Sequence, residues 1–147
     1  MKKLLFILLA AVISIPFWAC SDDDEPVVFG EMPSMAKAFV KSYFPGMQVV
    51  KVERDGKHSS AKYEVTLSDG TEIEFDSNGE WIDVDAPSGK AVPAGIVPAP
   101  IAKFVADTYP GQLINEFSRE HYGYKAELTN EVELEFDRDY ILIRIDR

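Results

Sequence analysis

The pattern of apolar and polar residues along this chain occurs twice. An alternating segment at 63–85 recurs at 124–146, with Tyr, Leu, a Glu-x-Glu-Phe-Asp core and Ile in step. The segments before them also match, because AFVKSYFPG ends at Gly46 and KFVADTYPG ends at Gly111. Internal repetition on this scale is typical of a fold assembled from one duplicated unit. The sequence therefore predicts two copies of one arrangement of elements.

Each copy begins with a predicted amphipathic helix. The first helix is expected to start at Pro33 and Ser34 and to end before Pro45, because proline disfavours helical backbone in the residue before it. The second is expected to start at Pro100 and to end before Pro110. The apolar stripes that should face a core are Met35, Ala38, Phe39 and Tyr43 in the first helix, and Ile101, Phe104, Val105 and Tyr109 in the second.

Four short strands are predicted after each helix. The alternation begins at Val50 and Val52 in the first copy and ends at Ile141, Ile143 and Ile145 in the second. The turns of the first copy favour tight hairpins, at Asp55-Gly56, Asp69-Gly70 and Asn78-Gly79. Those of the second copy lack glycine and should be less ideal, at Asn130-Glu131 and Asp139-Tyr140. Four strands joined by hairpins form an antiparallel meander.

Alternation also assigns each side chain to a face of the sheet. The face toward the helix is expected to hold Tyr63, Val65, Leu67, Ile73, Phe75, Ile82 and Val84. The opposite, open face is expected to hold Lys62, Glu64, Thr66, Glu72, Glu74, Trp81 and Asp83, and in the second copy Lys125, Glu127, Glu133, Glu135, Leu142 and Arg144. Trp81 and Leu142 occupy the same position of the two copies. Either they pack against neighbouring chain at a strand end, or they anchor a partner on the open face.

The N-terminal segment resembles an export signal followed by a tether. Lys2 and Lys3 precede an apolar run that is shorter than a membrane-spanning helix. Cys20, which is the single cysteine, comes directly after this run, and an acidic stretch follows it. This layout resembles a bacterial lipoprotein that is acylated at Cys20, and the acidic stretch resembles the signal that sends Bacteroidetes lipoproteins to the cell surface. The alternative is an ordinary secreted protein whose cysteine is incidental.

The predicted organisation has five segments. They are a signal peptide at 1–19, an acidic tether at 20–30, a first repeat at 31–85, a connector rich in proline and glycine at 86–99, and a second repeat at 100–147. Removal of 1–19 would leave 13 basic and 25 acidic residues, a net charge of −12. Such a charge argues against nucleic acid as a partner, because phosphates attract clustered Lys and Arg.

Catalytic motifs are absent from the sequence. The two histidines, His58 and His121, are expected in exposed positions between the first two strands of each copy. The sequence has no nucleophile elbow, no zinc-protease motif and no cluster that predicts a metal or cofactor. Paired carboxylates such as Glu72 with Glu74, or Asp83 with Asp85, share a face and leave an acidic-site hydrolase as a minor alternative.

The repeated helix and four strands resemble the PepSY-like, β-lactamase-inhibitor-protein-like domain of exported Bacteroidetes proteins. The motifs that carry the resemblance are Phe39-Val40-x-x-Tyr43-Phe44-Pro45-Gly46, Gly70-x-Glu72-Ile73-Glu74-Phe75-Asp76 and Asn78-Gly79-Glu80-Trp81, with their counterparts in the second copy. The resemblance implies an α+β fold of two tandem units, each a helix and four strands. Their sheets would join into one antiparallel sheet with both helices on one face. The inhibitor namesake binds its target through the open face.

The expected function is therefore a non-enzymatic binding module that is exported and lipid-anchored in the periplasm or on the outer membrane surface. Its partner would be an envelope or extracellular protein or peptide, bound as an inhibitor binds. The candidate contact residues on the open face are Trp81, Leu142, Lys62, Glu64, Glu72, Glu74, Glu133, Glu135 and Arg144. A structural or ligand-storage role in the cell envelope is the alternative.

Overall fold

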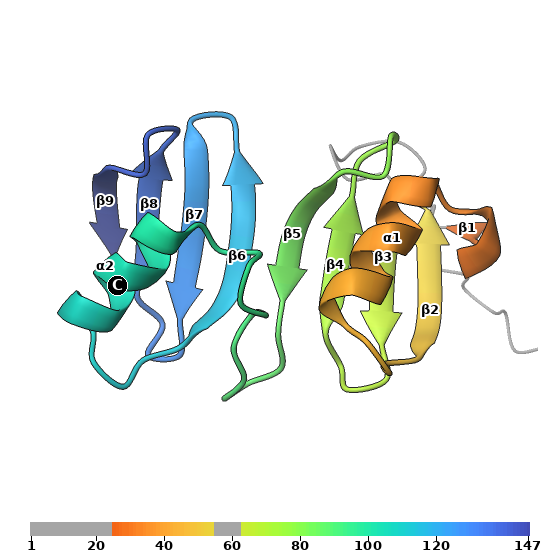
Figure 1. The fold of residues 1–147 in the computed structure, drawn as a ribbon, viewed down its shortest axis with the longest axis horizontal. Coiled ribbons are helices and arrows are strands. Elements are labelled where there is room, and N and C mark those ends of the chain that lie inside the picture. Colours follow the sequence, from red (N-terminus) through yellow and green to blue (C-terminus); the bar gives the residue numbers. More distant parts are fainter. Residues whose placement is uncertain (1–24, 55–62) are drawn as a thin grey trace, which may run out of the picture.

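The computed structural model describes residues 25–54 and 63–147 (Figure 1). The first repeat consists of α1 (Ser34–Tyr43), β2 (Val49–Arg54), β3 (Tyr63–Leu67), β4 (Glu72–Phe75) and β5 (Trp81–Asp85). The second repeat consists of α2 (Ala99–Thr108), β6 (Ile114–Glu120), β7 (Gly123–Leu128), β8 (Glu133–Asp137) and β9 (Leu142–Asp146). A two-residue strand β1 (Glu25–Pro26) and a 3₁₀ helix (Phe29–Glu31) precede α1.

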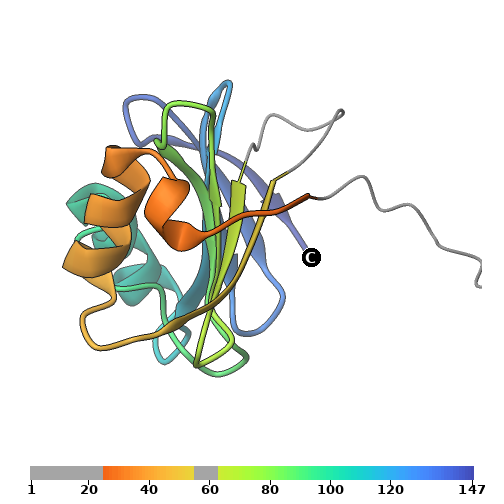
Figure 2. The same ribbon diagram turned by 90° about the vertical axis from the view of Figure 1, so that its right-hand side faces the viewer.

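All strands belong to one antiparallel sheet in the order β1 to β9. The repeats join where β5 pairs with β6, so that a single sheet runs through the whole molecule. Both helices lie on one side of this sheet, and no helix of the described residues lies on the other side, which is called the open face (Figure 2). The predicted α+β fold of two tandem repeats is confirmed.

The core lies between the helices and the sheet, and it repeats with the sequence. Phe75 and Phe136 are fully buried at equivalent positions, as the duplicated pattern predicts. Phe39 of α1 meets Phe75 edge-on with ring centroids 5.7 Å apart, and Phe104 of α2 meets Phe136 at the same distance. Burial of this apolar surface is the main contribution that holds each helix on the sheet.

A row of side chains crosses the covered face of the sheet from edge to edge. The Val84 row, defined by direct cross-strand pairs, consists of Val52, Val65, Ile73, Val84, Phe117, Ala126, Leu134 and Ile145. All of its members are buried except Ile145 on the edge strand β9, which is 45% exposed.

Trp81 and Leu142 lie on the covered face, so the sequence prediction is wrong for both. A β-bulge between Glu74 and Phe75 brings Trp81 directly opposite Phe75, and an equivalent bulge brings Leu142 opposite Phe136. Directly paired residues share a face, so both side chains point toward the helices and pack against the core. The extra residues of the bulges are Ile82 and Ile143. Strict alternation assigns Trp81 and Leu142 to the wrong face because it assumes that neither strand contains an extra residue.

Two smaller predictions are also wrong, one in β2 and one in α1. Val50 is the extra residue of a bulge in β2 and is exposed rather than buried. In α1 the buried residues are Ala36 and Val40, whereas Met35 and Ala38 are exposed. The stripe predicted for α2 is confirmed, with Ile101 and Val105 buried.

The ordered structure also begins earlier than residue 31. Val27 and Phe29 pack against the core, so the end of the predicted tether is part of the folded domain. In the connector, Val92 and Ile96 are buried, and α2 begins at Ala99. No helix in the described ranges is long and apolar enough to span a membrane.

The turns of the second repeat differ from those of the first as predicted. Gly70 and Gly79 have positive φ angles of 92° and 85° in the two hairpins of the first repeat that are described. The equivalent turns of the second repeat hold Glu131 and Tyr140 at φ angles of 64° and 65°. Residues with a Cβ are strained at positive φ. The second repeat therefore keeps the turn geometry of the first repeat but lacks the glycines that adopt it without strain.

Candidate functional site: the open face of the sheet

Two rows of side chains cross the open face, and direct pairing across every strand from β2 to β9 defines them. The Asp83 row consists of Glu53, Glu64, Glu74, Asp83, Ser118, Lys125, Glu135 and Arg144. The Asp85 row consists of Lys51, Thr66, Glu72, Asp85, Glu116, Glu127, Glu133 and Asp146. Together the two rows define the open face.

The open face is strongly acidic. Its two rows hold eleven carboxylates and three basic side chains, which gives a formal charge of −8. Like charges directly opposite each other in a sheet are destabilising. The face includes several such pairs, for example Glu64 with Glu74 and Asp85 with Glu116. This concentration of one charge costs stability and creates a negative potential over the sheet.

The three basic residues compensate this charge locally. Lys125 Nζ lies 3.0 Å from Glu116 Oε1, and Arg144 contacts both Glu135 at 2.6 Å and Asp146 at 2.7 Å. Lys51 Nζ lies 2.7 Å from Glu53 Oε2 at the other end. These ion pairs lie on β2, β6, β7, β8 and β9, and the middle strands β4 and β5 carry four carboxylates and no basic residue of the two rows.

Asp83 lies at the centre of this face, on the middle strand of the sheet. Its Oδ1 atom is buried and, among the described residues, has no hydrogen-bond partner. Burial, together with the charges of the nearby carboxylates Glu116 and Glu74, raises the pKa of Asp83 to about 7. A buried acceptor without a donor costs free energy unless a ligand supplies the missing donor.

Other carboxyl groups of the open face are perturbed in the same direction. Burial raises the pKa of Asp85, and so do Glu116 and Glu72 beside it. Burial also raises the pKa values of Glu64 and Glu127, with added repulsion from neighbouring carboxylates. The raised pKa values mean that burial and neighbouring carboxylates destabilise the ionised forms of these groups. A positively charged ligand would stabilise the ionised forms.

Two further features border the face. The hydroxyl of Tyr122, in the β6–β7 turn, hydrogen-bonds Glu135, while burial and the charges of Glu135 and Glu120 raise the pKa of Tyr122 to about 12.

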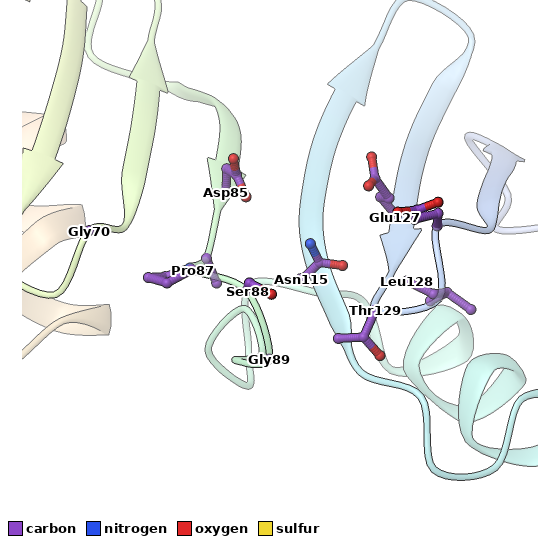
Figure 3. Close-up of a pocket in the computed structure, with 11 residues that line it drawn as sticks. Gly70, Asp85, Pro87, Ser88, Gly89, Asn115, Glu127, Leu128 and Thr129 are labelled. Carbon is purple, nitrogen blue, oxygen red and sulfur yellow. The ribbon is translucent and has the colours of Figure 1, made fainter.

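A polar cavity of about 290 Å³ lies at the end of the β5–β6 junction. Asp85, Asn115 and Glu127 line it from three successive strands (Figure 3). Asp85 and Glu127 also belong to the open face, so the cavity extends it.

The structure places most of the predicted contact residues on the open face. Glu64, Glu72, Glu74, Glu133, Glu135 and Arg144 lie there. Trp81 and Leu142 do not. Instead, Trp81 lies between Phe39, Phe117 and Arg119, with its ring centroid 6.0 Å from each phenyl ring and 4.3 Å from the guanidinium carbon. Trp81 thus joins the two repeats on the covered side.

Several predicted positions lie outside the described residues, namely Cys20, His58, Lys62 and the Asp55-Gly56 turn. His121 is exposed in the turn between β6 and β7, as expected. In the described ranges, no group of three or more His, Cys, Asp or Glu side chains is arranged to hold a metal ion.

The sequence prediction missed the importance of Glu116 and Ser118. Both lie on β6, which shows little alternation because Asn115 is the extra residue of a bulge between Ile114 and Glu116. The signal in the sequence is a spacing that both first strands share: Val49 and Val52 are three residues apart, as are Ile114 and Phe117, which is the spacing that a bulge produces.

The fold and the acidic face define a class of protein: a tandem α+β domain with one covered and one open sheet face. The family model described as "Putative beta-lactamase-inhibitor-like, PepSY-like" matches residues 18–62 and 61–144. The chain belongs to this family. The family description is inhibitor-like and names no enzymatic activity.

Solved structures of similar proteins come from Bacteroides. A Bacteroides thetaiotaomicron protein described as a "putative calcium-regulated periplasmic protein" is 35% identical, has a TM-score of 0.80, and covers 86% of this chain and 98% of its own. A Bacteroides vulgatus protein described as a "putative periplasmic protein" is 33% identical, with a TM-score of 0.78 and coverage of 86% and 99%. Another from Bacteroides vulgatus, of unknown function, is 27% identical, has a TM-score of 0.78, and covers 84% of this chain and 99% of its own. No curated protein matches.

Proposed function

We propose that this protein is an exported, lipid-anchored binding module whose open face binds a basic segment of another protein or a peptide. The observation that carries the proposal is the half-buried Asp83 at the centre of an acidic sheet, whose buried Oδ1 atom has no hydrogen-bond partner among the described residues. A Lys or Arg side chain supplies both a hydrogen-bond donor and a positive charge. It would therefore relieve the two unfavourable features at once.

The charge of the whole chain supports the same class of partner. The net charge is −10, and the open face carries −8 within its two rows. An acidic surface steers basic partners toward it and repels acidic ones. The inhibitor-like family description makes an enzyme with a basic rim around its active site one candidate partner.

Export is supported by the relatives, which are described as periplasmic. The lipid anchor rests on the sequence alone, because Cys20 follows the apolar N-terminal run directly. A tether would leave the folded domain free to turn its open face toward a partner in the envelope.

The proposed binding is tested by titrating the protein with a Lys/Arg-rich peptide and with a Glu-rich peptide of equal length, using calorimetry. We expect the basic peptide to bind and the acidic peptide not to bind. The variant Glu74→Gln/Asp83→Asn/Glu116→Gln should bind the basic peptide at least about tenfold more weakly, which corresponds to ~1.4 kcal/mol.

A matched control makes the same number of carboxyl-to-amide changes outside the open face. Asp107, Glu31 and Asp139 are exposed acidic residues outside the two rows, and the variant Glu31→Gln/Asp107→Asn/Asp139→Asn should bind as the native protein does. Equal loss in both triple variants would mean that net charge alone attracts the peptide. In that case the proposed site would be wrong.

Calcium is the second candidate ligand, because dense carboxylates attract divalent cations and one relative is described as calcium-regulated. The described carboxylates form no arrangement that would hold a metal ion, so we favour the basic peptide. Thermal denaturation with Ca²⁺ or Mg²⁺ at about 1 mM separates the two candidates. A rise in Tm with Ca²⁺ alone would favour calcium.

A further inference from the structure

The two repeats differ in what covers their last strand. In the first repeat β5 pairs with β6, the first strand of the next repeat. Its counterpart β9 pairs with β8 and, among the described residues, with no strand on its other side. Trp81 of β5 is covered by Phe117 and Arg119 of β6, whereas Leu142 of β9 has no such neighbour strand in the described part of the chain. The free edge of β9 therefore corresponds to the edge of β5 that pairs with β6 inside the molecule.

Three exposed isoleucines lie on β9 or directly before it. Ile141, Ile143 and Ile145 are 61%, 52% and 45% exposed. Natural sheets usually protect their edges with very short strands, proline or charge. The opposite edge follows this rule, because β1 has two residues and one of them is Pro26. The strand β9 has five residues, four of them exposed, and no proline; it holds a bulge at Ile143 and the two charged residues Arg144 and Asp146.

The charges of β9 are arranged so that the strand is complementary to itself. Arg144 belongs to the Asp83 row and Asp146 to the Asp85 row, so both lie on the open face, on either side of Ile145. In an antiparallel pair centred on Ile145, Arg144 of each copy lies opposite Asp146 of the other. Opposite charges in direct cross-strand pairs are stabilising. The same arrangement brings the two Ile145 side chains together and extends the Val84 row into the second copy.

We propose that β9 is a self-association edge, at which two copies of this chain pair antiparallel about Ile145 and continue one sheet through both molecules. Moving the centre to Arg144 would place the two guanidinium groups opposite each other, which is unfavourable. Pairing of β9 with the other edge of a second copy is opposed by β1, which already covers β2. The result is a closed, two-fold dimer rather than a filament.

Cysteine trapping tests the pairing and its register. The chain has one cysteine, so the full chain with Cys20→Ser has none and serves as the background for single substitutions. In the proposed register the Cα atoms of position 145 are about 5 Å apart, within the range of a disulfide. Position 143 would lie about 14 Å along the strand from its counterpart, because four residues separate them.

Ile145→Cys should therefore form a disulfide-linked dimer under mild oxidation, and the similarly exposed Ile143→Cys should form at least about tenfold less. No dimer at position 145, or equal yields at both positions, would overturn the proposal. A mixed disulfide between position 145 and a different protein would overturn it as well, because the edge would then serve another partner.

A charge exchange provides a second test without cysteine. Arg144→Asp and Asp146→Arg should each weaken dimerisation in analytical ultracentrifugation, because each single change places like charges opposite each other. The double variant Arg144→Asp/Asp146→Arg should restore dimerisation, because exchanging both side chains again brings opposite charges together across the joint. Circular dichroism checks that all three variants fold. Folded single variants that dimerise like the native chain would contradict the pairing, and so would a double variant without recovery.

Discussion

At the scale of single residues, Asp83 is the most informative position. A carboxyl group in the middle of an antiparallel sheet is normally solvated or paired. Here its Oδ1 atom is buried without a donor among the described residues, and Glu74 and Glu116 lie close enough to raise its pKa. Groups that are held in an unfavourable state often mark functional sites, because selection for stability alone would remove them.

The raised pKa of Asp83 makes a prediction about stability. The folded state holds a proton on Asp83 up to about pH 7, whereas the unfolded chain releases it near pH 4. Between these values the folded state binds more protons, so the free energy of unfolding falls as the pH rises. Asp83→Asn should abolish this loss. It should raise stability by about 1–3 kcal/mol at pH 8 and change it little at pH 4.

Urea denaturation of the native protein and of Asp83→Asn at pH 4, 6 and 8 provides the measurement. Asp107→Asn on α2 makes the same charge change on the opposite side of the molecule and serves as the control. If Asp83→Asn were equally destabilising at every pH, the assigned environment of Asp83 would be incorrect.

Glu131 gives a second prediction at this scale. It has a positive φ of 64° at the position where the first repeat has Gly70, and it is exposed. Glu131→Gly should therefore stabilise the protein by about 1 kcal/mol, because it relieves backbone strain. Asn130→Gly, in the same turn but without positive φ, should be neutral or destabilising because of the added backbone freedom of the unfolded chain. A drop in Tm for Glu131→Gly would contradict this account of the turn.

At the scale of elements, the sequence predicts the helices, the strands and their order within each repeat, because the hydrophobic pattern is strong and duplicated. The joining of the two repeats into one sheet was implied by the family resemblance. It does not predict the bulges. A bulge adds one residue to a strand, and the alternation after that residue changes face. This is why strict alternation assigns Trp81, Leu142 and Val50 to the wrong face, whereas it assigns β3, β4, β7 and β8 correctly.

The predicted stripe of α1 is wrong for a different reason. Its small residues, Ala36 and Ala38, do not reveal by hydrophobicity which one is buried. Aligning the two repeats would have resolved this, because Ala36 and Val40 occupy the positions of Ile101 and Val105. The acidic surface was predictable from its glutamates, but the burial of Asp83 was not. It depends on β6 and on the join between the repeats.

The position of Trp81 leads to a prediction about the joint between the repeats. Its ring contacts Phe39 of the first repeat and Phe117 and Arg119 of the second. Trp81→Ala should reduce the free energy of unfolding by about 2–4 kcal/mol, because it opens a cavity where the two repeats meet. Leu142→Ala, at the equivalent edge position, should cost less, about 1–2 kcal/mol. A Trp81→Ala variant with an unchanged Tm would contradict the covered-face assignment.

At the scale of the whole molecule, the two faces of the sheet have separate roles. The covered face carries the helices and the core, and the open face carries an excess of negative charge. Similar proteins with solved structures are described as periplasmic, which supports export but does not identify a partner. The charge distribution of the open face is therefore the strongest guide to what this protein binds.

The proposed anchor gives a prediction for the full chain. If Cys20 is acylated, the protein should fractionate with membranes, and Cys20→Ser should move most of it to the soluble fraction. A single acyl chain binds membranes only marginally, so stable anchoring requires the several chains that lipoprotein maturation attaches. Ser21→Ala beside it serves as the control and should stay with the membranes. Membrane association of Cys20→Ser would show that the cysteine is not the anchor.

The central claim is that the open face around Asp83 binds a basic partner, and an NMR titration of the Asp83 carboxyl carbon tests it most directly. The free protein should show a pKa of about 7 at this carbon. A saturating Lys/Arg-rich peptide should lower this pKa by at least about one unit, which corresponds to ~1.4 kcal/mol of interaction with the charged form. A pKa that stays the same when the peptide is bound would contradict the claim, because the peptide would then lie elsewhere on the molecule.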